Sequence, residues 1–579
     1  MKTTSFYIRL IKKIKYQVTH LDLVPRLFEL FPRKDSSGKL LFEAYTLNSF
    51  GKDCLSGVIV GIVALPLAMG FSIAAGGTPA QGLYTAIAAG FFISAMGGSR
   101  FQIGGPTGAF VVIIAGVIAN FGMTGLIAAT VMAGIILVLM GLFGFGKFIK
   151  YIPYPVTTGF TTGIGVIIFS QQLKDFFGLS IEKSSANFIA KWHEYFLAAS
   201  TVNIETFCMG ALTLAIIIFV RKFFNRLPAA VIGVLFCTLI TYFFNLEIDT
   251  IGSRFGGISA KLPTPEIPHI LSVITEVFPA AITIALLAAI ESLLSAVVAD
   301  SMTNDRHNSN MELIAQGIGN IASGIFGGIP ATGAIARTAT NIKSGAVSPI
   351  SGIVHTITLL LFILFLSNAA SAIPLAALSA VLIVVASDMS NIKRFIHIIK
   401  TEPKSDSTVL ITTCALTILF DLTFAVEVGM MLAVLLFIYR MVETGTIKAE
   451  NNEIIAEMAY GEVGENTAEA MRALAKNDID VFEITGPFFF GVADMLQGTL
   501  QHLKKTPKKI ILRMRDVPSI DSTGIAALES FLVNCRKKDI QLIFCEMRKK
   551  PRLVLEKSGY VNELGAHNIT ETLEEAVNF

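Results

Sequence analysis

Two stretches decide the fold of this chain: Gly104-Gly105-Pro106-Thr107-Gly108-Ala109-Phe110 and Gly327-Gly328-Ile329-Pro330-Ala331-Thr332-Gly333-Ala334. Each leads into an apolar segment, at about 106–119 and about 333–345, that is too short to cross a bilayer, since a spanning helix needs about 20 apolar residues. The two segments are the third and the tenth of fourteen, so they occupy corresponding places in two halves. This spacing predicts a polytopic α-helical membrane protein with inverted repeats, whose broken helices meet near the midplane.

The composition indicates where the membrane part lies. The chain has 579 residues, of which 53% are hydrophobic and 15% charged, whereas a soluble globular chain is about a quarter charged. Of its 89 Asp, Glu, Lys and Arg residues, only 36 lie among the 387 residues from Cys54 to Arg440. We therefore expect an N-terminal cytoplasmic segment at 1–53, a transmembrane domain at 54–441, and a cytoplasmic domain at 442–579 whose core begins at about 452.

The apolar middle divides into fourteen candidate spans. They lie at about 54–73, 82–97, 106–119, 122–143, 155–171, 203–223, 227–245, 279–300, 311–327, 333–345, 347–366, 373–388, 406–422 and 423–441. A twelve-span count stays open, and either even number places both termini on one side. With that side cytoplasmic, eleven Lys and Arg residues between the spans face the cytoplasm and five face outward, as the positive-inside rule requires. We expect an integral protein of the bacterial inner membrane with both termini in the cytoplasm.

The two short segments also indicate the charge of the ligand. Unpaired N–H groups at a helix start bind anions with the help of the helix dipole, so two facing helix starts form an anion cradle. Arg337 lies one turn into the second short helix and Arg100 shortly before the first stretch, and a buried cation there favours an anion. Three alternatives stay open: Gly and Pro only kink packed helices, Arg337 pairs with a carboxylate such as Glu291, and Arg100 snorkels toward the cytoplasm.

One carboxylate lies deep in the apolar middle. Glu291 is near the centre of a candidate span, where a carboxylate is costly and is a functional hypothesis by default. Ser295 follows four residues later and therefore shares a helical face with it. The pair suits proton coupling, or a cation site built from the two side-chain oxygens, and a structural role opposite Arg337 is compatible with either.

Other classes of function find no support in the sequence. The six cysteines show no C-x-x-C spacing and no nearby histidine cluster, so neither a metal site nor a disulfide framework is expected. The net charge of +3 and the lack of a basic stripe argue against nucleic acid as a partner. No nucleophile–base pair and no phosphate loop indicate an enzyme, and no cofactor is expected.

A set of local motifs carries a resemblance to a known family. The motifs are Val63-Ala64-Leu65-Pro66-Leu67-Ala68-Met69, Gly82-Leu83-Tyr84-Thr85-Ala86, Gly97-Gly98-Ser99-Arg100-Phe101, Gly105-Pro106-Thr107, Ile290-Glu291-Ser292-Leu293-Leu294, Gln316-Gly317-Ile318-Gly319-Asn320 and Ala336-Arg337-Thr338. Together they resemble the SulP (sulfate permease) family, also called solute carrier family 26, over most of residues 50–579. The resemblance implies fourteen spans in a seven-plus-seven inverted repeat, with a core and a gate domain, an elevator-like transport step and a homodimer.

The resemblance also assigns a role in substrate binding to four residues. Thr107, Gly333 and Ala334 match positions that line the family's anion site, and Arg337 matches the basic residue at its edge. The substrate is expected to be a small inorganic or organic anion: sulfate, bicarbonate and C4-dicarboxylates all suit two helix starts and one arginine. The motifs around Val63–Met69 and Gly97–Phe101, together with Tyr84, look most like dicarboxylate-transporting members.

The coupling ion is suggested by the same comparison. Glu291 and Ser295 match the carboxylate and the hydroxyl that sodium-dependent bicarbonate members use for cation coupling. Two departures favour H⁺ over Na⁺: the carboxylate is Glu rather than Asp, and Ile335 replaces a threonine that helps to hold sodium. Leu67 stands where some proton-coupled members carry an acidic residue, so the proton path stays open.

The polar C-terminal region reads as an α/β domain. Candidate strands are Ile454–Met458, Val481–Ile484, Lys509–Met514 and Gln541–Cys545, with helices at about 492–503, 522–536, 549–558 and 571–577. The turn Pro518-Ser519-Ile520-Asp521-Ser522-Thr523-Gly524 resembles the signature of the STAS domain (sulfate transporter and anti-sigma factor antagonist). Asp521 or Ser522 is expected to cap the next helix. The resemblance makes Ser522 and Thr523 candidate phosphorylation sites under a cytoplasmic regulator, with a plain cap as the alternative.

The sequence as a whole predicts a secondary active transporter of small anions in the lipid bilayer. An anion channel or exchanger of the same family is the first alternative, since sequence separates these modes poorly. A nucleobase transporter of the same fold is the second, although such a protein would lack a STAS domain and would normally have no arginine at the cradle. A membrane-embedded enzyme is the least supported.

Overall fold

The computed structural model describes residues 23–30, 45–147, 153–181, 188–224, 228–258, 265, 274–420, 422–444, 446–449, 479–489, 492, 495–496 and 506–579. The chain separates into two compact units, Met1–Met431 and Leu432–Phe579.

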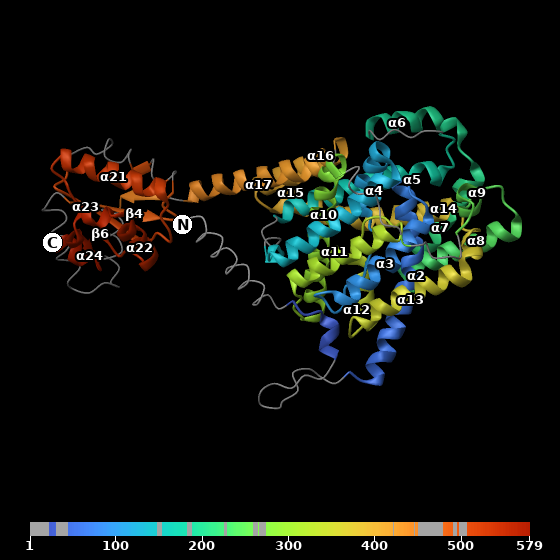
Figure 1. Ribbon diagram of the computed structural model, residues 1–579. Helices are drawn as coiled ribbons and strands as arrows, with labels where there is room; N and C mark the ends of the chain where they lie inside the picture. Colours follow the sequence, from blue (N-terminus) through green and yellow to red (C-terminus); the bar gives the residue numbers. More distant parts are fainter. Residues whose placement is uncertain are drawn as a thin grey trace. The chain divides into compact units, whose positions relative to one another are not determined.

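The first unit is a bundle of α-helices (Figure 1). Its helices are α2 (Leu47–Ala74), α3 (Pro79–Met96), α4 (Val111–Leu142), α5 (Tyr154–Phe177), α6 (Phe188–Leu197), α7 (Ile204–Phe223), α8 (Ala229–Phe244), α9 (Ile251–Phe255), α10 (Ile274–Thr303), α11 (Ser309–Ile325), α12 (Ile335–Lys343), α13 (Ile350–Ala370), α14 (Leu375–Ser390), α15 (Ile392–Thr401) and α16 (Lys404–Leu419). Helix α17 (Leu422–Thr444) begins in the first unit and ends in the second. Short 3₁₀ helices are η1 (Arg26–Leu30), η2 (Gly108–Phe110), η3 (Phe145–Lys147) and η5 (Ala198–Thr201). Its two strands are β1 (Gly104–Gly105) and β2 (Thr332–Gly333).

Each of the fourteen apolar segments contains helix in the described structure. The segments at 106–119 and 122–143 fall in one helix, α4, which Gly122 interrupts with φ 68° and ψ −174°. Seven described helical runs are long and apolar enough to cross a membrane: Leu47–Ala74, Gly108–Leu142, Ile204–Phe223, Thr275–Thr303, Ile350–Ala370, Leu375–Thr401 and Phe424–Met441. The protein is therefore a polytopic helical membrane protein, while the count of fourteen spans and the inverted repeat stay predictions.

Local sequence explains the helix ends, and small residues explain the close packing. Thr78 and Gln81 form a capping box at the start of α3, ahead of a proline in the first turn. The backbones of helices α4 and α11 approach each other closely at Gly134 and Gly317. A Cβ added to Gly134 would lie 2.6 Å from the carbonyl oxygen of Gly317. Small residues at such crossings let membrane helices pack at short range.

The second unit is an α/β domain with a five-stranded sheet of order β3-β4-β5-β6-β7. Its elements are β3 (Thr446–Ala449), β4 (Ile479–Thr485), β5 (Lys509–Asp516), α21 (Ser522–Lys537), β6 (Gln541–Cys545), α22 (Lys549–Ser558), α23 (Tyr560–Leu564), η7 (Ala566–Asn568), β7 (Ile569–Thr570) and α24 (Leu573–Asn578). Strand β3 runs antiparallel to β4, and the remaining pairs are parallel.

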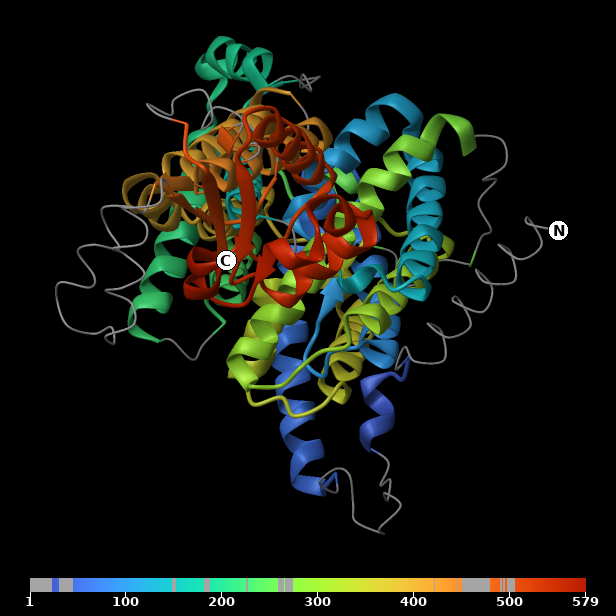
Figure 2. The same cartoon turned by 90° about the vertical axis from the view of Figure 1, so that its left-hand side faces the viewer.

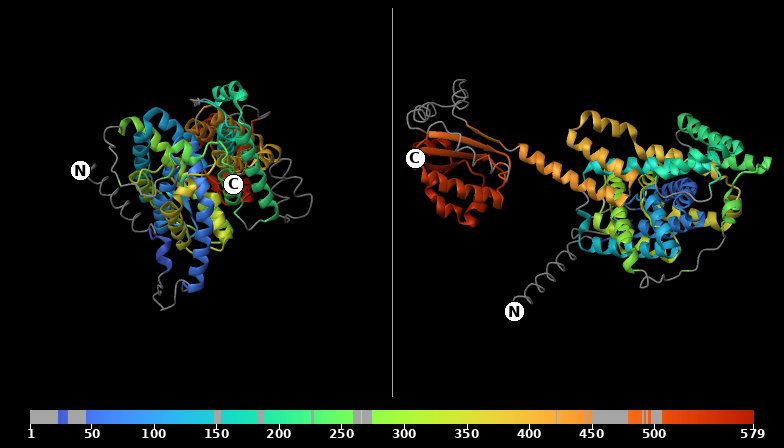
Figure 3. Two further views of the ribbon diagram at one scale, coloured as in Figure 1. Left: turned by 90° about the vertical axis from the view of Figure 1, so that its right-hand side faces the viewer. Right: turned by 90° about the horizontal axis from the view of Figure 1, so that it is seen from above.

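Helices of this unit lie against its sheet (Figures 2 and 3). Apolar side chains form one cluster on each face of the sheet. Alternate strand residues pack against α24 on one face and against α21, α22 and α23 on the other. The predicted strands at Val481–Ile484, Lys509–Met514 and Gln541–Cys545 are confirmed. The predicted strand Ile454–Met458 and most of the helix at 492–503 lie outside the described residues, and β3 and β7 were not expected.

Candidate functional site: an anion cradle

The two Gly/Pro stretches lie side by side in the first unit. Strand β1 pairs antiparallel with β2, with Gly104 opposite Gly333 and Gly105 opposite Thr332. Beyond the pair, β1 leads through η2 into α4, and β2 leads into α12. Residues more than 220 positions apart in the sequence are thus joined by backbone pairing, and two helix starts lie at one place.

The backbone at these helix starts leaves N–H groups ahead of the first intrahelical bonds. The first such bonds run from the N–H of Phe110 to the carbonyl of Thr107 and from the N–H of Thr338 to the carbonyl of Ala334. Residues 108–109 and 335–337 therefore hold amides that an anion can accept bonds from. The N–H of Ala334 itself donates to the carbonyl of Ile103 at 2.8 Å, so at Ala334 the cradle offers backbone shape rather than a donor.

Arg337 connects the two halves of the cradle. Its side chain is buried, and Nη2 donates a hydrogen bond to the carbonyl of Pro106 in the first stretch. Among the described residues, the buried Nη1 has no hydrogen-bond partner. A Cβ on Gly105, whose φ is +152°, would lie 2.5 Å from Nη1. A glycine at this position therefore makes room for the guanidinium and leaves a donor directed at the site.

Glu291 and Ser295 extend from α10 to opposite halves of the cradle. The hydroxyl of Thr107 donates to Glu291 Oε2 at 2.9 Å, while the hydroxyl of Ser295 donates to Thr338 Oγ1 at 3.2 Å. Thr338 Oγ1 also accepts the N–H of Ile103 at 3.1 Å. In the described part of the chain, no ion pair joins Glu291 to Arg337. The sequence left open that Arg337 pairs with a carboxylate such as Glu291. In the structure its guanidinium bonds to the backbone carbonyl of Pro106 instead.

Arg100 takes no part in the cradle. Its Nε lies 3.5 Å from Asp305 Oδ2, and a third of its side chain is exposed.

Four of the sequence-predicted site residues (Thr107, Glu291, Ser295 and Arg337) lie within one hydrogen-bonded neighbourhood with Gly333 and Ala334. No group of three or more His, Cys, Asp and Glu residues arranged to hold a metal ion occurs among the residues searched.

Gln102 is a site residue that sequence reasoning missed. It is buried, its Nε2 donates to the carbonyl of Ser292 on α10 at 3.0 Å, and its Oε1 has no partner among the described residues. A Cβ on Gly333 would overlap Nε2 of Gln102. A signal was available, because Gln102 is a polar amide only two residues before the glycines of the first stretch.

His355 on α13 is the other buried polar group near the cradle that the sequence did not single out. Both ring nitrogens are buried, and neither has a hydrogen-bond partner in the described structure. A Cβ on Gly90 of α3 would lie 3.8 Å from Cε1 of His355 and 3.1 Å from the carbonyl oxygen of Gly104. The imidazole and the backbone of β1 therefore both border Gly90 of α3.

We predict that Gly333→Ala lowers transport about tenfold or more while the protein still folds. The added methyl overlaps Gln102, so the amide must leave its bond to Ser292 or β2 must move away from β1. Overpacking of this kind costs about 1–3 kcal/mol, which corresponds to roughly 5- to 150-fold if it falls on the binding site. Initial rates of uptake into proteoliposomes measure the effect. Gly116→Ala on α4 is the matched control, because nothing lies within 4 Å of its Cβ, and equal rates for the two variants would contradict the prediction.

Comparisons with known proteins identify relatives of this chain. The family model described as "Sulfate permease family" matches residues 50–413, and that of the STAS domain matches residues 470–576. The chain is 40% identical over 540 residues to the putative sulfate transporter YvdB of Bacillus subtilis, covering 92% of this chain and 98% of the relative. It is 29% identical over 537 residues to the bicarbonate transporter BicA of Picosynechococcus, covering 91% and 94%.

Solved structures give the same fold. The transmembrane domain of a cyanobacterial bicarbonate transporter, BicA, matches with a TM-score of 0.58 and 31% identity, covering 67% of this chain and 98% of that one. The murine anion transporter Slc26a9 in its inward-facing state matches with a TM-score of 0.80 and 17% identity, covering 92% of each chain. At that identity the second match supports the fold alone.

Proposed function

The chain belongs to the sulfate permease family, a family of membrane anion transporters rather than enzymes, and on that premise we propose that it carries a small oxyanion by proton-coupled secondary active transport. Sulfate is the first candidate substrate, bicarbonate the second and a C4-dicarboxylate the third. The order follows the names of the relatives, of which one is a putative sulfate transporter and another a bicarbonate transporter.

One observation carries the proposal: two helix starts and the buried Nη1 of Arg337 converge where β1 pairs with β2. Amide N–H groups and a guanidinium N–H are donors only, so they suit a ligand with several acceptor oxygens. A buried arginine beside helix N-termini also disfavours a cationic ligand. Thr107, Gly333, Ala334 and Arg337 are the residues we assign to the anion.

We propose that protons and not sodium ions drive transport, because of the side-chain oxygens that lie beside the cradle. Glu291 is the only carboxylate whose hydrogen bonds, within the described residues, reach the first stretch, and Ser295 is bonded to Thr338. The side chain of Ile335 at the start of α12 carries no oxygen that could hold a cation. A single Glu next to an anion site takes up or releases a proton as the site fills and empties, because a nearby anion disfavours its charged form. No cofactor is invoked.

An elevator-like step is supported by how firmly the two cradle stretches are tied together. The backbone pair β1–β2 joins the two stretches directly. The bond from Ala334 to Ile103, and the bond from Asn341 Nδ2 on α12 to the carbonyl of Phe101 at 3.0 Å, join the residues just before the first stretch to the second stretch and to α12. A cradle built this way moves as one body with its ligand. We propose in addition that both termini face the cytoplasm and that the protein is a homodimer.

Uptake by purified protein in liposomes tests the function. Labelled sulfate, bicarbonate and succinate are offered in turn against an imposed proton gradient, an imposed sodium gradient, or neither. We expect accumulation of one oxyanion above equilibrium with the proton gradient alone. Accumulation with sodium alone would reject proton coupling, and flux that never exceeds equilibrium under any gradient would identify a channel or an exchanger.

Ser522 and Thr523 are proposed as a phosphorylation site of the second unit. Both are exposed at the start of α21, while Asp521 caps this helix by accepting the N–H of Gly524 at 2.7 Å. The cap that was expected from Asp521 or Ser522 is thus made by Asp521, which leaves both hydroxyls free of that role. Phosphate at a helix start is electrostatically favourable.

We predict that Ser522→Ala with Thr523→Ala leaves the transport of unphosphorylated protein unchanged. The same double variant is expected to lose the incorporation of phosphate that cell extract gives the wild type. Measurement is by labelled phosphate on the purified full chain, with exposed Ser558→Ala as the control. Equal incorporation in wild type and double variant would reject this site.

A further inference from the structure

The short helix α15 is separated from the span that precedes it. Asn391 adopts a left-handed conformation, φ 37° and ψ 49°, which ends α14 at Ser390 and starts α15 at Ile392. Ten helical residues extend about 15 Å, half of the hydrocarbon thickness, so α15 cannot cross the bilayer. It connects two apolar helices, α14 and α16. It must therefore lie at the side of the membrane where α14 ends and α16 begins.

One face of α15 is fixed to the helix bundle. Ile398 is fully buried, and its carbonyl accepts a bond from the hydroxyl of Ser407 on α16. The guanidinium of Arg394 lies 5.3 Å from the ring centroid of Tyr154 at the start of α5, and its Nη2 lies 3.3 Å from Glu402 Oε1. These contacts on α5 and α16 determine which side of α15 faces outward.

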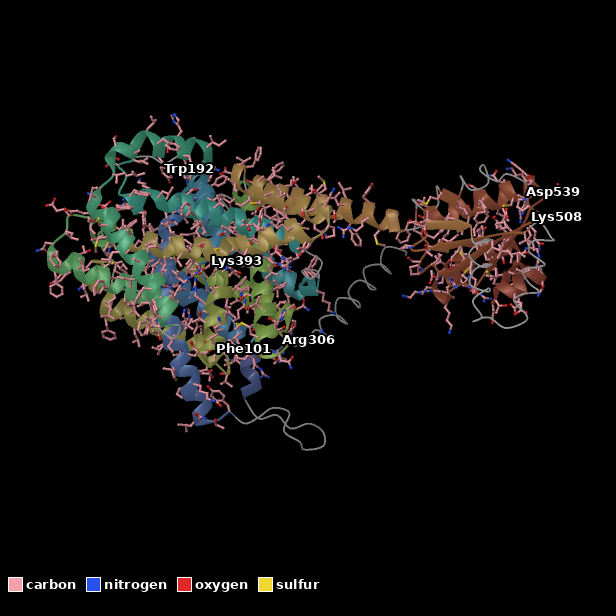
Figure 4. The ribbon with its side chains drawn as sticks, turned by 180° about the vertical axis from the view of Figure 1, so that it is seen from behind. Phe101, Trp192, Arg306, Lys393, Lys508 and Asp539 are labelled. Carbon is pink, nitrogen blue, oxygen red and sulfur yellow. The ribbon has the colours of Figure 1, made fainter. Side chains whose placement is uncertain are left out.

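The outward side carries an apolar stripe beside a basic one. Ile392, Ile396 and Ile399, spaced i, i+4, i+7, are 57%, 44% and 40% exposed. Lys393, His397 and Lys400 repeat the same spacing one residue later, and all three are exposed (Lys393 is labelled in Figure 4). In the described part of the chain, neither lysine forms an ion pair.

We propose that α15 lies in the membrane interface, with its isoleucine stripe among the acyl chains and with Lys393 and Lys400 bound to the headgroups of anionic phospholipids. A helix with one apolar and one basic stripe has the composition of an interfacial helix. Basic residues at that depth are attracted by anionic lipid. On the neighbouring helix α16, Ile411 is also exposed.

The chain segment just before α15 contacts the anion cradle. Met389, three residues before α15, contacts the first stretch, because a Cβ on Gly108 would lie 2.9 Å from its sulfur. The hydroxyl of Thr162 on α5 donates to the carbonyl of Ser390 at 2.8 Å, which fixes the end of α14. Lipid bound to α15 therefore holds the segment that borders the cradle.

A fluorescence experiment tests the proposal without relying on transport. The chain has one tryptophan, Trp192, so Trp192→Phe gives a dark background in which Ile396→Trp places a single reporter on α15. The full-length protein is reconstituted in vesicles that contain brominated phosphatidylcholine or brominated phosphatidylglycerol at equal mole fraction. We expect quenching by both lipids, and at least twofold stronger quenching by the anionic one.

Charge variants then separate selectivity from insertion. Lys393→Gln with Lys400→Gln is expected to remove the preference for the anionic lipid, since two basic contacts correspond to roughly a 30-fold change in binding. Lys393→Arg with Lys400→Arg should keep the preference, as should Lys549→Gln with Lys550→Gln on α22, which removes the same charge from exposed positions.

Two outcomes would overturn the proposal. No quenching by either lipid would show that α15 lies outside the membrane, for example covered by the second unit or by another copy of the chain. Equal quenching by both lipids in the protein with both lysines would show that the helix enters the interface without binding anionic headgroups.

Discussion

Arg337→Ala is expected to lower the initial rate of anion uptake by about 100-fold or more. The guanidinium is buried, bonds to the carbonyl of Pro106 and keeps a second donor in the cradle. Removal therefore takes away both the charge that attracts the anion and a link between the two stretches. Truncating one partner of a buried charged contact costs about 2–5 kcal/mol, which corresponds to about 30- to several-thousand-fold in binding. Initial rates at subsaturating anion in proteoliposomes measure the loss.

Two variants serve as controls for this result. Arg100→Ala removes an arginine whose side chain is one-third exposed and pairs with Asp305 outside the cradle. Its rate should stay within about twofold of wild type, because surface ion pairs contribute little. Arg337→Lys keeps the charge but not the planar fork, so we expect partial activity. Size-exclusion profiles establish that each variant is folded, and a wild-type rate in folded Arg337→Ala would remove Arg337 from the site.

Glu291→Gln is expected to abolish accumulation against a gradient while exchange of labelled for unlabelled anion continues. The amide oxygen of glutamine still accepts the bond from Thr107, so the local geometry is retained, but the side chain no longer binds or releases a proton. Uphill uptake needs that proton, whereas one-for-one exchange at equal concentrations does not. The measurement compares proton-driven accumulation with counterflow in the same vesicles.

Glu276→Gln is the matched control, because Glu276 lies exposed near the start of the same helix. We expect it to leave both modes unchanged. Ser295→Ala distinguishes a cation site from a proton site: loss of its bond to Thr338 should reduce rates without changing the coupling ion. Proton-driven accumulation by Glu291→Gln would contradict the assignment of Glu291 as the coupling residue.

Much of the fold follows from local pattern. Apolar runs of about 20 residues predict helices at α2, α7, α10 and α13 because the bilayer selects for that length, and the structure confirms helix in each. The strand at Gln541–Cys545 matches β6 because a short apolar run in a polar domain leaves few alternatives. The Gly/Pro stretches predicted that two broken helices meet, since such helices mark binding sites in membrane transporters, and the structure pairs the two stretches through β1 and β2.

Other features depend on contacts that no single stretch contains. Gln102 becomes part of the cradle only because α10 brings the carbonyl of Ser292 to it and Gly333 leaves it room. His355 is an ordinary polar residue of a span until Gly90 and β1 pack around its ring. The lysines of α15 look like ordinary loop charges in the sequence, because the apolar and basic stripes of this helix can be distinguished only when Ile398 is known to be its buried face.

The sequence by itself determined that this is a helical membrane protein with an α/β tail, and it determined which charges lie in the apolar part, because burying charge in a bilayer is costly enough to leave few of them. The tertiary structure decided how those charges are used. Glu291 and Arg337 do not pair with each other; each bonds instead to the first stretch, one through Thr107 and the other through Pro106. The physical reason is distance along the chain: residues about 184 and 231 positions apart become partners only through the packing of α10 and α12 against the first stretch.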